Sequence, residues 1–290
     1  MQLVSSAGLI PTSARSLPKL RLYEPRSVAE ALDALSRAAN PVLLSGGTDL
    51  VARFNEGLSP GELINLAHVA QLRTVSADAR HLRIGAAVTH GAGCSHPTVR
   101  ERAPGFAHAW SRISNPRIRF RATLGGNLMA QRPRYEGALL LSAIGAELEF
   151  ATAAGASKLA PADLWAGRIP PRSLLTAITI DTGGLAWYAY ERSMRPLITL
   201  AACLRRPVDG GGAGWRLRCA VGTEYLHPAL LELNLPGTEL REIASAAKAI
   251  ADQAFTQLPS DFFDPVATRA YCMAAGSVLL ARQLAGADRV

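Results

Sequence analysis

The chain has 290 residues, 49% of them hydrophobic and 19% charged, which is typical of a packed globular protein and excludes a disordered one. No apolar run approaches the ~20 residues that span a bilayer, and the N-terminus has no basic residue before Arg15, so we expect a loose leader over residues 1–16, no secretory signal and a cytoplasmic protein. The formal net charge is +8 with only three lysines, but the arginines are scattered and aromatic residues make up 6%, which argues against a nucleic-acid surface and favours an acidic partner or an anionic cofactor.

The N-terminal part of the chain alternates helix and strand patterns. Apolar residues recur at helical spacing over 27–38, where Ser27 is placed to cap the helix and Glu30 predicts a capping box. Strands are predicted in PVLLSGG, in GELINLAHV with a turn after it, in HLRIGAAVTH and in SLLTAITID. The segment 137–151 begins as a helix, which Gly145 ends before the strand AELEFA.

The pattern changes after about Asp181. Three segments, LAWYAYERS, LITLAACLRR and WRLRCAVGT, predict successive strands, with DGGGAG (209–214) as a hairpin loop. Helices are predicted over 240–253 and 265–284. The order predicts an α+β N-terminal domain to about residue 181, followed by a smaller domain of a sheet with helices.

The cysteines and histidines form no metal-ligand pattern. Without a CxxC pair among Cys94, Cys203, Cys219 and Cys272, we expect no iron–sulfur cluster and no metal on this chain, and we interpret the cysteines as small hydrophobic residues. His90 flanks Cys94 in THGAGCSHP, but the glycines there favour a turn ahead of a helix, with His90 near its start. The GxSxG elbow and the GxxxxGK[ST] loop are both absent from the sequence, which gives little support to serine-hydrolase or P-loop chemistry.

Two glycine pairs, in SGGTDL and TLGGNL, carry the strongest chemical signal. Glycine lets the backbone approach a diphosphate closely and adopt positive φ, and a following helix adds its dipole. The amides placed to converge are those of Gly46, Gly47, Thr48, Gly125, Gly126 and Asn127, and the hydroxyls those of Ser45, Thr48 and Thr123. Each pair taken alone is more often an ordinary turn, but two of them suggest a divided anion-binding cradle.

The order of these segments resembles the FAD-binding medium subunit of the molybdenum hydroxylases, the family of carbon monoxide dehydrogenase and xanthine dehydrogenase. The resemblance runs from about residue 17 to residue 284. Its most specific parts are PVLLSGGTDL and NPRIRFRATLGGNL, supported by HLRIGAAVTH, YAYERSMR and a softer C-terminal pattern.

The resemblance implies a two-subdomain FAD-binding domain of the vanillyl-alcohol-oxidase (PCMH) type over 17–181. A C-terminal domain like that of the carbon monoxide dehydrogenase flavoprotein would follow over 182–290. The implied FAD contacts are Leu43, Leu44, Ser45, Gly46, Gly47, Thr48, Asp49, Leu50, Ile113, Ser114, Ala122, Thr123, Gly125, Gly126, Asn127, Glu136, Leu175 and Arg192. Neither glycine loop contains histidine or cysteine, so we expect the FAD to be bound non-covalently.

Four positions depart from the family pattern. Glu136 stands in place of an aspartate and is expected to accept from a ribose hydroxyl, whereas Phe120 replaces a small polar residue. Arg132 and Arg134 add charge that either assists the diphosphate or faces a partner.

We therefore expect an oxidoreductase subunit that carries FAD and transfers electrons, without acid–base catalytic residues of its own. The resemblance implies a large molybdopterin subunit, a small iron–sulfur subunit, and NAD or another electron acceptor. Two alternatives remain open: a stand-alone flavin oxidase of the same fold, which needs a poised base, and a scaffold subunit that has lost flavin.

Overall fold

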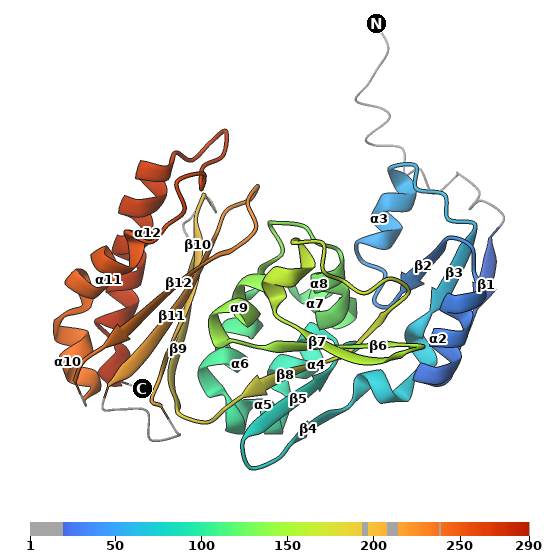
Figure 1. Cartoon of the computed structure of the whole chain (residues 1–290), viewed down its shortest axis with the longest axis horizontal. Helices are drawn as coiled ribbons and strands as arrows, with labels where there is room; N and C mark the ends of the chain where they lie inside the picture. Colours follow the sequence, from blue (N-terminus) through green and yellow to red (C-terminus); the bar gives the residue numbers. More distant parts are fainter. Residues whose placement is uncertain (1–19, 193–196, 208–213, 238, 290) are drawn as a thin grey trace, which may run out of the picture.

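The computed structural model of the protein describes residues 20–192, 197–207, 214–237 and 239–289, arranged in three lobes along the molecule (Figure 1). Each lobe is organised around its own cluster of buried apolar side chains. The expected leader over 1–16, the end of YAYERSMR and residues 209–213 of the predicted hairpin loop lie outside the described residues.

The first lobe is a three-stranded parallel sheet in the order β1-β3-β2, covered by one helix. Its elements are β1 (Arg21–Tyr23), α2 (Val28–Arg37), β2 (Pro41–Leu44), α3 (Leu50–Asn55) and β3 (Glu62–Asn65). The Ser27 side chain caps α2 as predicted, by accepting from the backbone N–H of Glu30 at 3.1 Å. The capping box is only half formed, because the Glu30 carboxylate accepts from the backbone N–H of Arg26 at 2.8 Å and not from that of Ser27.

The second lobe is a five-stranded antiparallel sheet in the order β4-β5-β8-β6-β7, with helices packed against it (Figure 1). The strands are β4 (Val75–Ala77), β5 (His81–Gly85), β6 (Glu147–Thr152), β7 (Gly155–Leu159) and β8 (Leu174–Asp181). The helices are α4 (His90–Ser95), α5 (Pro97–Arg102), α6 (Pro104–Arg112), α7 (Pro116–Arg121), α8 (Leu124–Met129) and α9 (Glu136–Ile144). Short 3₁₀ turns lie at η2 (Leu66–His68), η3 (Ala70–Arg73) and η4 (Pro161–Leu164).

The predictions about the segment 81–96 are confirmed in part. The predicted strand is present over His81–Gly85 but ends there, where the amide of Ala87 bonds to the carbonyl of Leu72. The glycines after His90 do not form a turn ahead of a helix; they lie within α4, which the Thr89 side chain caps through the N–H of Ala92.

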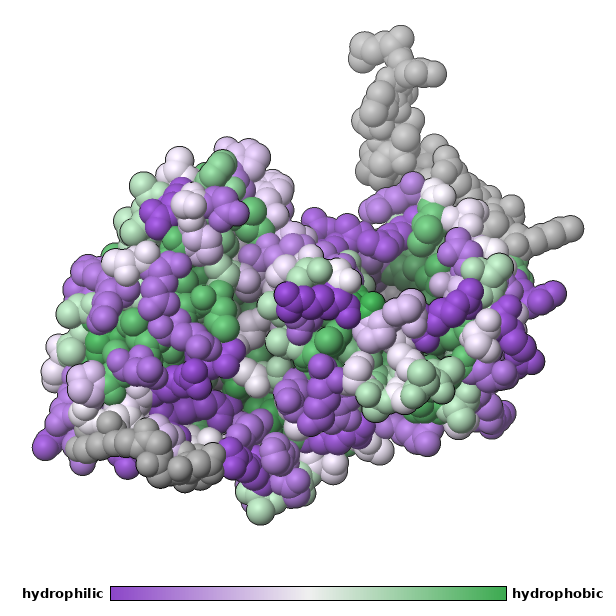
Figure 2. All heavy atoms as spheres, in the orientation of Figure 1, coloured by the Kyte–Doolittle hydropathy of each residue, from purple (hydrophilic) through white to green (hydrophobic). Residues whose placement is uncertain are grey.

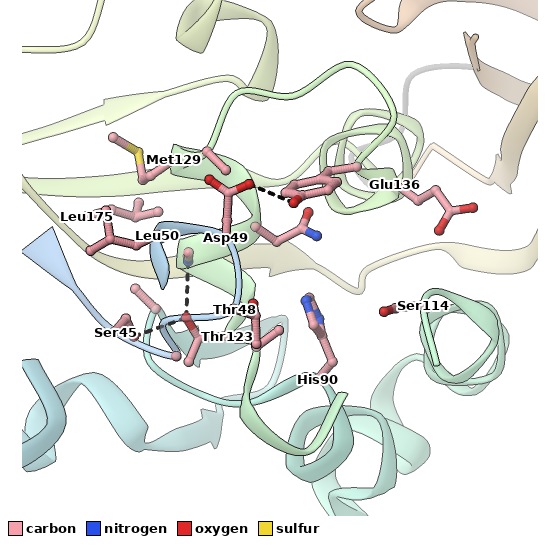
Figure 3. A pocket seen from close by; sticks show the side chains of 18 of the residues that line it. Ser45, Thr48, Asp49, Leu50, His90, Ser114, Thr123, Met129, Glu136 and Leu175 are labelled. Atoms are coloured by element: carbon pink, nitrogen blue, oxygen red, sulfur yellow. Dashed lines mark hydrogen bonds between the residues drawn. The ribbon is translucent and has the colours of Figure 1, made fainter. Parts of the chain in front are cut away.

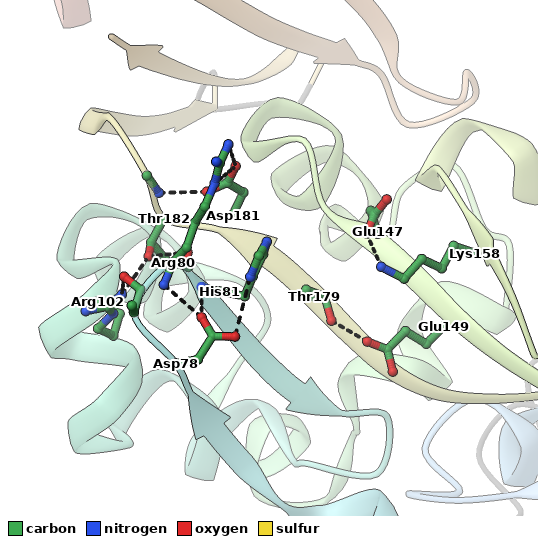
Figure 4. Close-up of polar contacts among 12 residues, drawn as sticks. Asp78, Arg80, His81, Arg102, Glu147, Glu149, Lys158, Thr179, Asp181 and Thr182 are labelled. Atoms are coloured by element: carbon green, nitrogen blue, oxygen red, sulfur yellow. Dashed lines mark hydrogen bonds and ion pairs between the residues drawn. The ribbon is translucent and has the colours of Figure 1, made fainter. Parts of the chain in front are cut away.

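A charged cluster closes the outer end of this sheet (Figure 4). Asp78 accepts from the backbone N–H groups of Arg80 and His81, both at 2.7 Å, in the turn between β4 and β5. The Arg80 guanidinium pairs with Asp181 at the end of β8, at 3.0 Å. The two backbone hydrogen bonds to Asp78, of which that from His81 is the larger cause, hold the pKa of Asp78 below its usual value. The cluster therefore has a structural role.

The third lobe is a four-stranded antiparallel sheet in the order β12-β11-β10-β9, backed by helices. It comprises β9 (Leu185–Arg192), β10 (Thr199–Arg205), β11 (Trp215–Gly222), β12 (Ala229–Leu235), α10 (Leu240–Ser245), α11 (Ala247–Phe255), α12 (Arg269–Leu284) and η5 (Ala287–Arg289). The three predicted strands are confirmed, whereas β12 was not predicted. The helix predicted over 240–253 is divided at Ala246, and the last helix begins at Arg269 because the Asp264 carboxylate holds residues 264–267 in a turn.

Helix α9 joins the second and third lobes. Eight of its nine residues are buried, and Gly145 ends it in the left-handed conformation, as predicted. Side chains of the third lobe then reach its last carbonyls: Arg205 donates to Ile144 O at 2.9 Å and Cys203 to Ala143 O at 3.0 Å. The Tyr188 hydroxyl donates to Leu140 O at 2.9 Å within the same buried interface.

The buried hydrogen bond of Tyr188 predicts a stability difference. We expect Tyr188→Phe to lower the free energy of unfolding by about 1 kcal/mol, because one buried hydrogen bond is lost while the ring is kept. Tyr271→Phe, at an exposed position of α12, is the matched control and should leave stability unchanged. Urea unfolding followed by circular dichroism measures both, and equal stabilities of the two variants would contradict the assigned contact.

Candidate functional site

A cavity of about 740 Å³ lies where the three lobes meet. Figure 2 shows a hollow with apolar walls beside the first lobe. Strand β2, both glycine loops, the start of α9 and the facing edge of the third lobe contribute to its lining. Of the positions predicted from the sequence, those that line it are Leu43, Ser45, Gly46, Gly47, Thr48, Asp49, Leu50, Ile113, Ser114, Ala122, Thr123, Gly125, Gly126, Asn127, Glu136, Leu175 and Arg192.

Leu44 is the predicted site residue that the structure does not bring to the cavity. The Leu44 side chain instead lies against Gly47, with its Cδ1 3.3 Å from where a Cβ on that glycine would lie.

The two glycine loops are held against each other and against the second lobe. A Cβ on Gly46 would collide with the carbonyl oxygen of Arg121, just before the second loop. The Thr123 hydroxyl donates to Ser45 Oγ at 3.0 Å (Figure 3). A Cβ on Gly125 would lie 2.7 Å from the Ala86 oxygen. Glycine is therefore required at 46 and 125 for close backbone packing, independently of any ligand.

The backbone amides of the two loops differ in what they bond. In the second loop, the N–H groups of Leu124 and Gly125 donate to Val88 O and Ala86 O, and that of Gly126 donates to Thr123 Oγ1. In the first loop, the N–H groups of residues 46–49 have no hydrogen-bond partner within the described part of the chain. The expectation that amides of both loops converge on an anion is thus contradicted for the second glycine loop. The first glycine loop has the amides that are available to bind an anion.

The expected positive φ is found in only one glycine of the two pairs. Gly47 has φ +76°, whereas Gly126 lies in α8 with ordinary helical geometry. A Cβ on Gly126 would meet Thr123 Oγ1 at 2.8 Å and nothing else nearby, so this position opens toward the cavity.

Asp49 connects the first glycine loop to residues 132–135, which follow the second glycine loop. Its carboxylate accepts from Arg132 Nε at 2.5 Å and from the Tyr135 hydroxyl at 2.7 Å, and it pairs with Arg53 at 3.1 Å. Burial and this hydrogen bond raise the pKa of Tyr135. Arg132 is therefore paired with Asp49 and does not line the cavity, whereas Arg134 lines it.

Glu136 begins α9 and is also held by protein groups. Its carboxylate accepts from the Tyr190 hydroxyl and pairs with Arg192 at 3.3 Å, both on strand β9. This arrangement links the third lobe to the cavity through Glu136, one of the four residues that depart from the family pattern. Phe120, another of the four, lies on α7 with 82% of its surface exposed and away from the cavity.

The charges that line the cavity balance. Three arginines face three carboxylates, which are Arg53, Arg134 and Arg192 against Asp49, Glu136 and Glu224. Because Arg53 is paired with Asp49 and Arg192 with Glu136, the groups available to an anion are the neutral hydrogen-bond donors together with Arg134.

Some lining residues were not predicted. His90, Tyr135, Ser173, Thr223 and Glu224 contribute polar groups, and the last two come from the turn after β11. His90 is the last residue of the HLRIGAAVTH motif, which supported the resemblance to the family. Nothing in the sequence indicates, however, that the His90 ring faces the cavity.

His90 is buried, with 1% of its surface exposed, and its Nδ1 accepts a hydrogen bond from Trp110 Nε1 at 2.8 Å. Burial, together with the charge of Arg119, lowers the pKa of His90 to about 4. The neighbouring Cys94 is buried as expected, and its thiol donates to the carbonyl of Gly91.

Among the residues that the structure describes, no group of His, Cys, Asp or Glu side chains is arranged to hold a metal ion. Within the same residues, no helix has the length and apolar character needed to cross a membrane.

The family model described as the FAD binding domain in molybdopterin dehydrogenase matches residues 18–181. The nicotine 6-hydroxylase medium subunit of Paenarthrobacter nicotinovorans is 31% identical over 152 residues, which are 52% of this chain and 54% of that protein. The carbon monoxide dehydrogenase medium chain of Afipia carboxidovorans is 28% identical over 199 residues, 65% of this chain and 69% of that protein. The chain thus matches little more than half the length of the first of these relatives.

The solved structure of quinoline 2-oxidoreductase from Pseudomonas putida 86 contains a chain with the same fold. It superposes with a TM-score of 0.79 at 22% identity and covers 95% of this chain and 99% of that chain. The likeness extends over all three lobes, so the α+β fold predicted from the sequence is confirmed.

The lowered pKa of His90 predicts a pH dependence of stability. Its stabilising contribution is fully present above pH 6.5 and is lost as the pH falls toward 4, because the unfolded chain takes up the proton first. Relative to His90→Asn, the wild type should lose about 2 kcal/mol of unfolding free energy between pH 7.5 and pH 5, at about 1.4 kcal/mol per pH unit below the unfolded pKa. Denaturant titrations of both proteins at the two pH values measure this difference, and parallel pH profiles would contradict it.

Proposed function

The chain belongs to the family of FAD-binding domains of molybdopterin dehydrogenases, and from this premise we propose that it is the FAD-carrying electron-transfer subunit of a multi-subunit molybdenum hydroxylase. The partners of such a subunit would be a large molybdopterin subunit and a small iron–sulfur subunit, with NAD or another molecule as electron acceptor. The observation that carries the proposal is the cavity between the lobes, into which both glycine loops open.

The residues present fit FAD. The cavity of about 740 Å³ falls in the size range of cofactor sites, and the unpartnered amides of residues 46–49 suit an anionic diphosphate. FAD supplies reversible uptake and release of electrons when bound.

We assign roles to the lining residues from their positions. The first loop would hold the diphosphate through its amides and the Thr48 hydroxyl, while Gly126 leaves room beside it. Ile113, Ser114 and Leu175 would contact the rest of the cofactor. Glu136, oriented by Tyr190 and Arg192, would present its remaining acceptor capacity to a hydroxyl group. Asp49 would hold the loops in register more than contact the cofactor.

FAD binding is tested with the purified protein and one glycine variant. We expect the purified protein to show flavin absorbance, and acid precipitation to release all of the flavin into the supernatant, because the attachment is non-covalent.

We expect Gly126→Val to lose FAD with its fold retained, because the added carbons enter the cavity beside Thr123. Gly61→Val is the matched control, since a Cβ there meets no atom within 4 Å. Flavin that stays with the pellet, or stoichiometric FAD in Gly126→Val, would count against these assignments.

The electron-transfer role predicts dependence on the partner subunits. The isolated FAD-loaded chain should not be reduced by purines, aldehydes or N-heterocycles, because the hydroxylating centre lies on another subunit. NADH or a dye should still exchange electrons with its flavin. Flavin absorbance is followed during anaerobic mixing, with and without the large and small subunits. Bleaching by an organic substrate at a catalytic rate without partners would favour the stand-alone oxidase, whereas bleaching only after the subunits are added would support the proposal.

A further inference from the structure

His90 is held in a single orientation at the wall of the cavity. It is the first residue of α4, and its backbone N–H donates to Ala122 O, which fastens it beside the second glycine loop. The ring of Trp110 meets the imidazole edge-on, with the ring planes 87° apart and the centroids separated by 6.1 Å. Both rings are buried, so the imidazole has no room to rotate freely.

The contact with Trp110 fixes the protonation state of the imidazole. An indole N–H only donates, so the His90 Nδ1 that receives it at 2.8 Å must carry a lone pair. The remaining proton of the neutral ring then lies on Nε2. Burial and the positive charge of Arg119 disfavour a second proton. His90 is therefore a neutral group with one N–H to offer.

This N–H has no partner in the protein. Nε2 is buried and has no hydrogen-bond partner within the described part of the chain. A buried donor left unpaired destabilises a fold, so its retention needs an explanation. His90 lines the cavity, and Figure 3 shows its ring directed into it, drawn between Thr48 and Ser114.

We propose that His90 is a cofactor-binding residue, whose Nε2–H donates a hydrogen bond to an acceptor oxygen of the FAD in this cavity. The inference rests on the function proposed above and adds a residue to the predicted contacts. Because Trp110 fixes the tautomer, His90 Nε2–H can only donate a hydrogen bond to the ligand. It cannot serve as a proton acceptor at neutral pH. A stand-alone oxidase would need such a base.

Two substitutions distinguish the roles of the two ring nitrogen atoms of His90. His90→Asn places an amide oxygen near the position of Nδ1, so it keeps an acceptor for Trp110 and removes the donor that faces the cavity. His90→Gln places an amide N–H₂ near the position of Nε2, so it keeps the donor and removes the acceptor for Trp110. FAD affinity of each apoprotein is measured by quenching of flavin fluorescence, and stability by thermal unfolding of the same apoproteins.

We expect His90→Asn to bind FAD about tenfold more weakly than the wild type, with a thermal midpoint close to that of the wild type, since one hydrogen bond to the ligand is lost. His90→Gln should bind FAD within about threefold of the wild type but unfold at a lower temperature. Unchanged FAD affinity in His90→Asn, or losses of affinity that follow the losses of stability in both variants, would overturn the proposal. A wild-type protein that binds no FAD would instead overturn the proposed function.

A measurement on the wild type covers the case in which a variant does not fold. In protein labelled with ¹⁵N-histidine, the His90 ring of the apoprotein should stay neutral with its proton on Nε2 down to pH 5. On addition of FAD this N–H resonance should shift while the nitrogen keeps its proton. A resonance that FAD leaves unchanged, or that loses its proton, would contradict the assignment.

Discussion

The carbonyl groups at the end of a buried helix must find donors inside the protein, and this requirement connects the lobes. Helix α9 ends at the buried residue Ile144, and its last carbonyls accept from Gly145 and Ala146 and from Arg205, Arg218 and Cys203 of the third lobe. Because the donors come from β10 and β11, the third lobe is held in one position against the second. The other end of the same helix carries Glu136, which faces the cavity. Contacts remote from the site thereby determine where Glu136 and Arg192 meet.

The two glycine pairs look alike in the sequence, but the structure requires each glycine for a different reason. Gly46 and Gly125 allow backbones to pack without a Cβ between them, Gly47 takes a positive φ, and Gly126 opens toward the cavity. The backbone at Arg121 and at Ala86 is what leaves no room for a side chain at positions 46 and 125. A conservative change to alanine would therefore act on packing at two of these positions and on backbone strain at a third.

Features that depend on neighbours in the sequence were predictable. The cap of Ser27, the stop at Gly145 and the β-branched strand β8 follow from local propensity and side-chain period. The helices α5–α7 were not predicted, because they span at most nine residues, too few to show a clear helical period. Of these helices, α6 buries Phe106 and Trp110, whereas no residue of α7 is buried. The clustering of the predicted site residues followed from a motif resemblance. Tertiary packing determines which amides remain unpaired and that the Leu44 side chain does not reach the cavity. No local sequence pattern encodes these features.

The titratable groups of the cavity favour binding over proton transfer. A general base works best with a pKa near the working pH, but the pKa of His90 falls and that of Tyr135 rises, so both move away from neutrality. Asp49 is occupied by Arg132, Arg53 and Tyr135, and Glu136 by Tyr190 and Arg192, so neither of these two carboxylates stands alone toward a substrate. The third lining carboxylate, Glu224, lies at an exposed position in the turn after β11. A site of fixed donors and compensated charges needs little rearrangement when electrons arrive or leave. That property suits a subunit that carries electrons between centres, and it disfavours an oxidase that must remove a proton from its substrate.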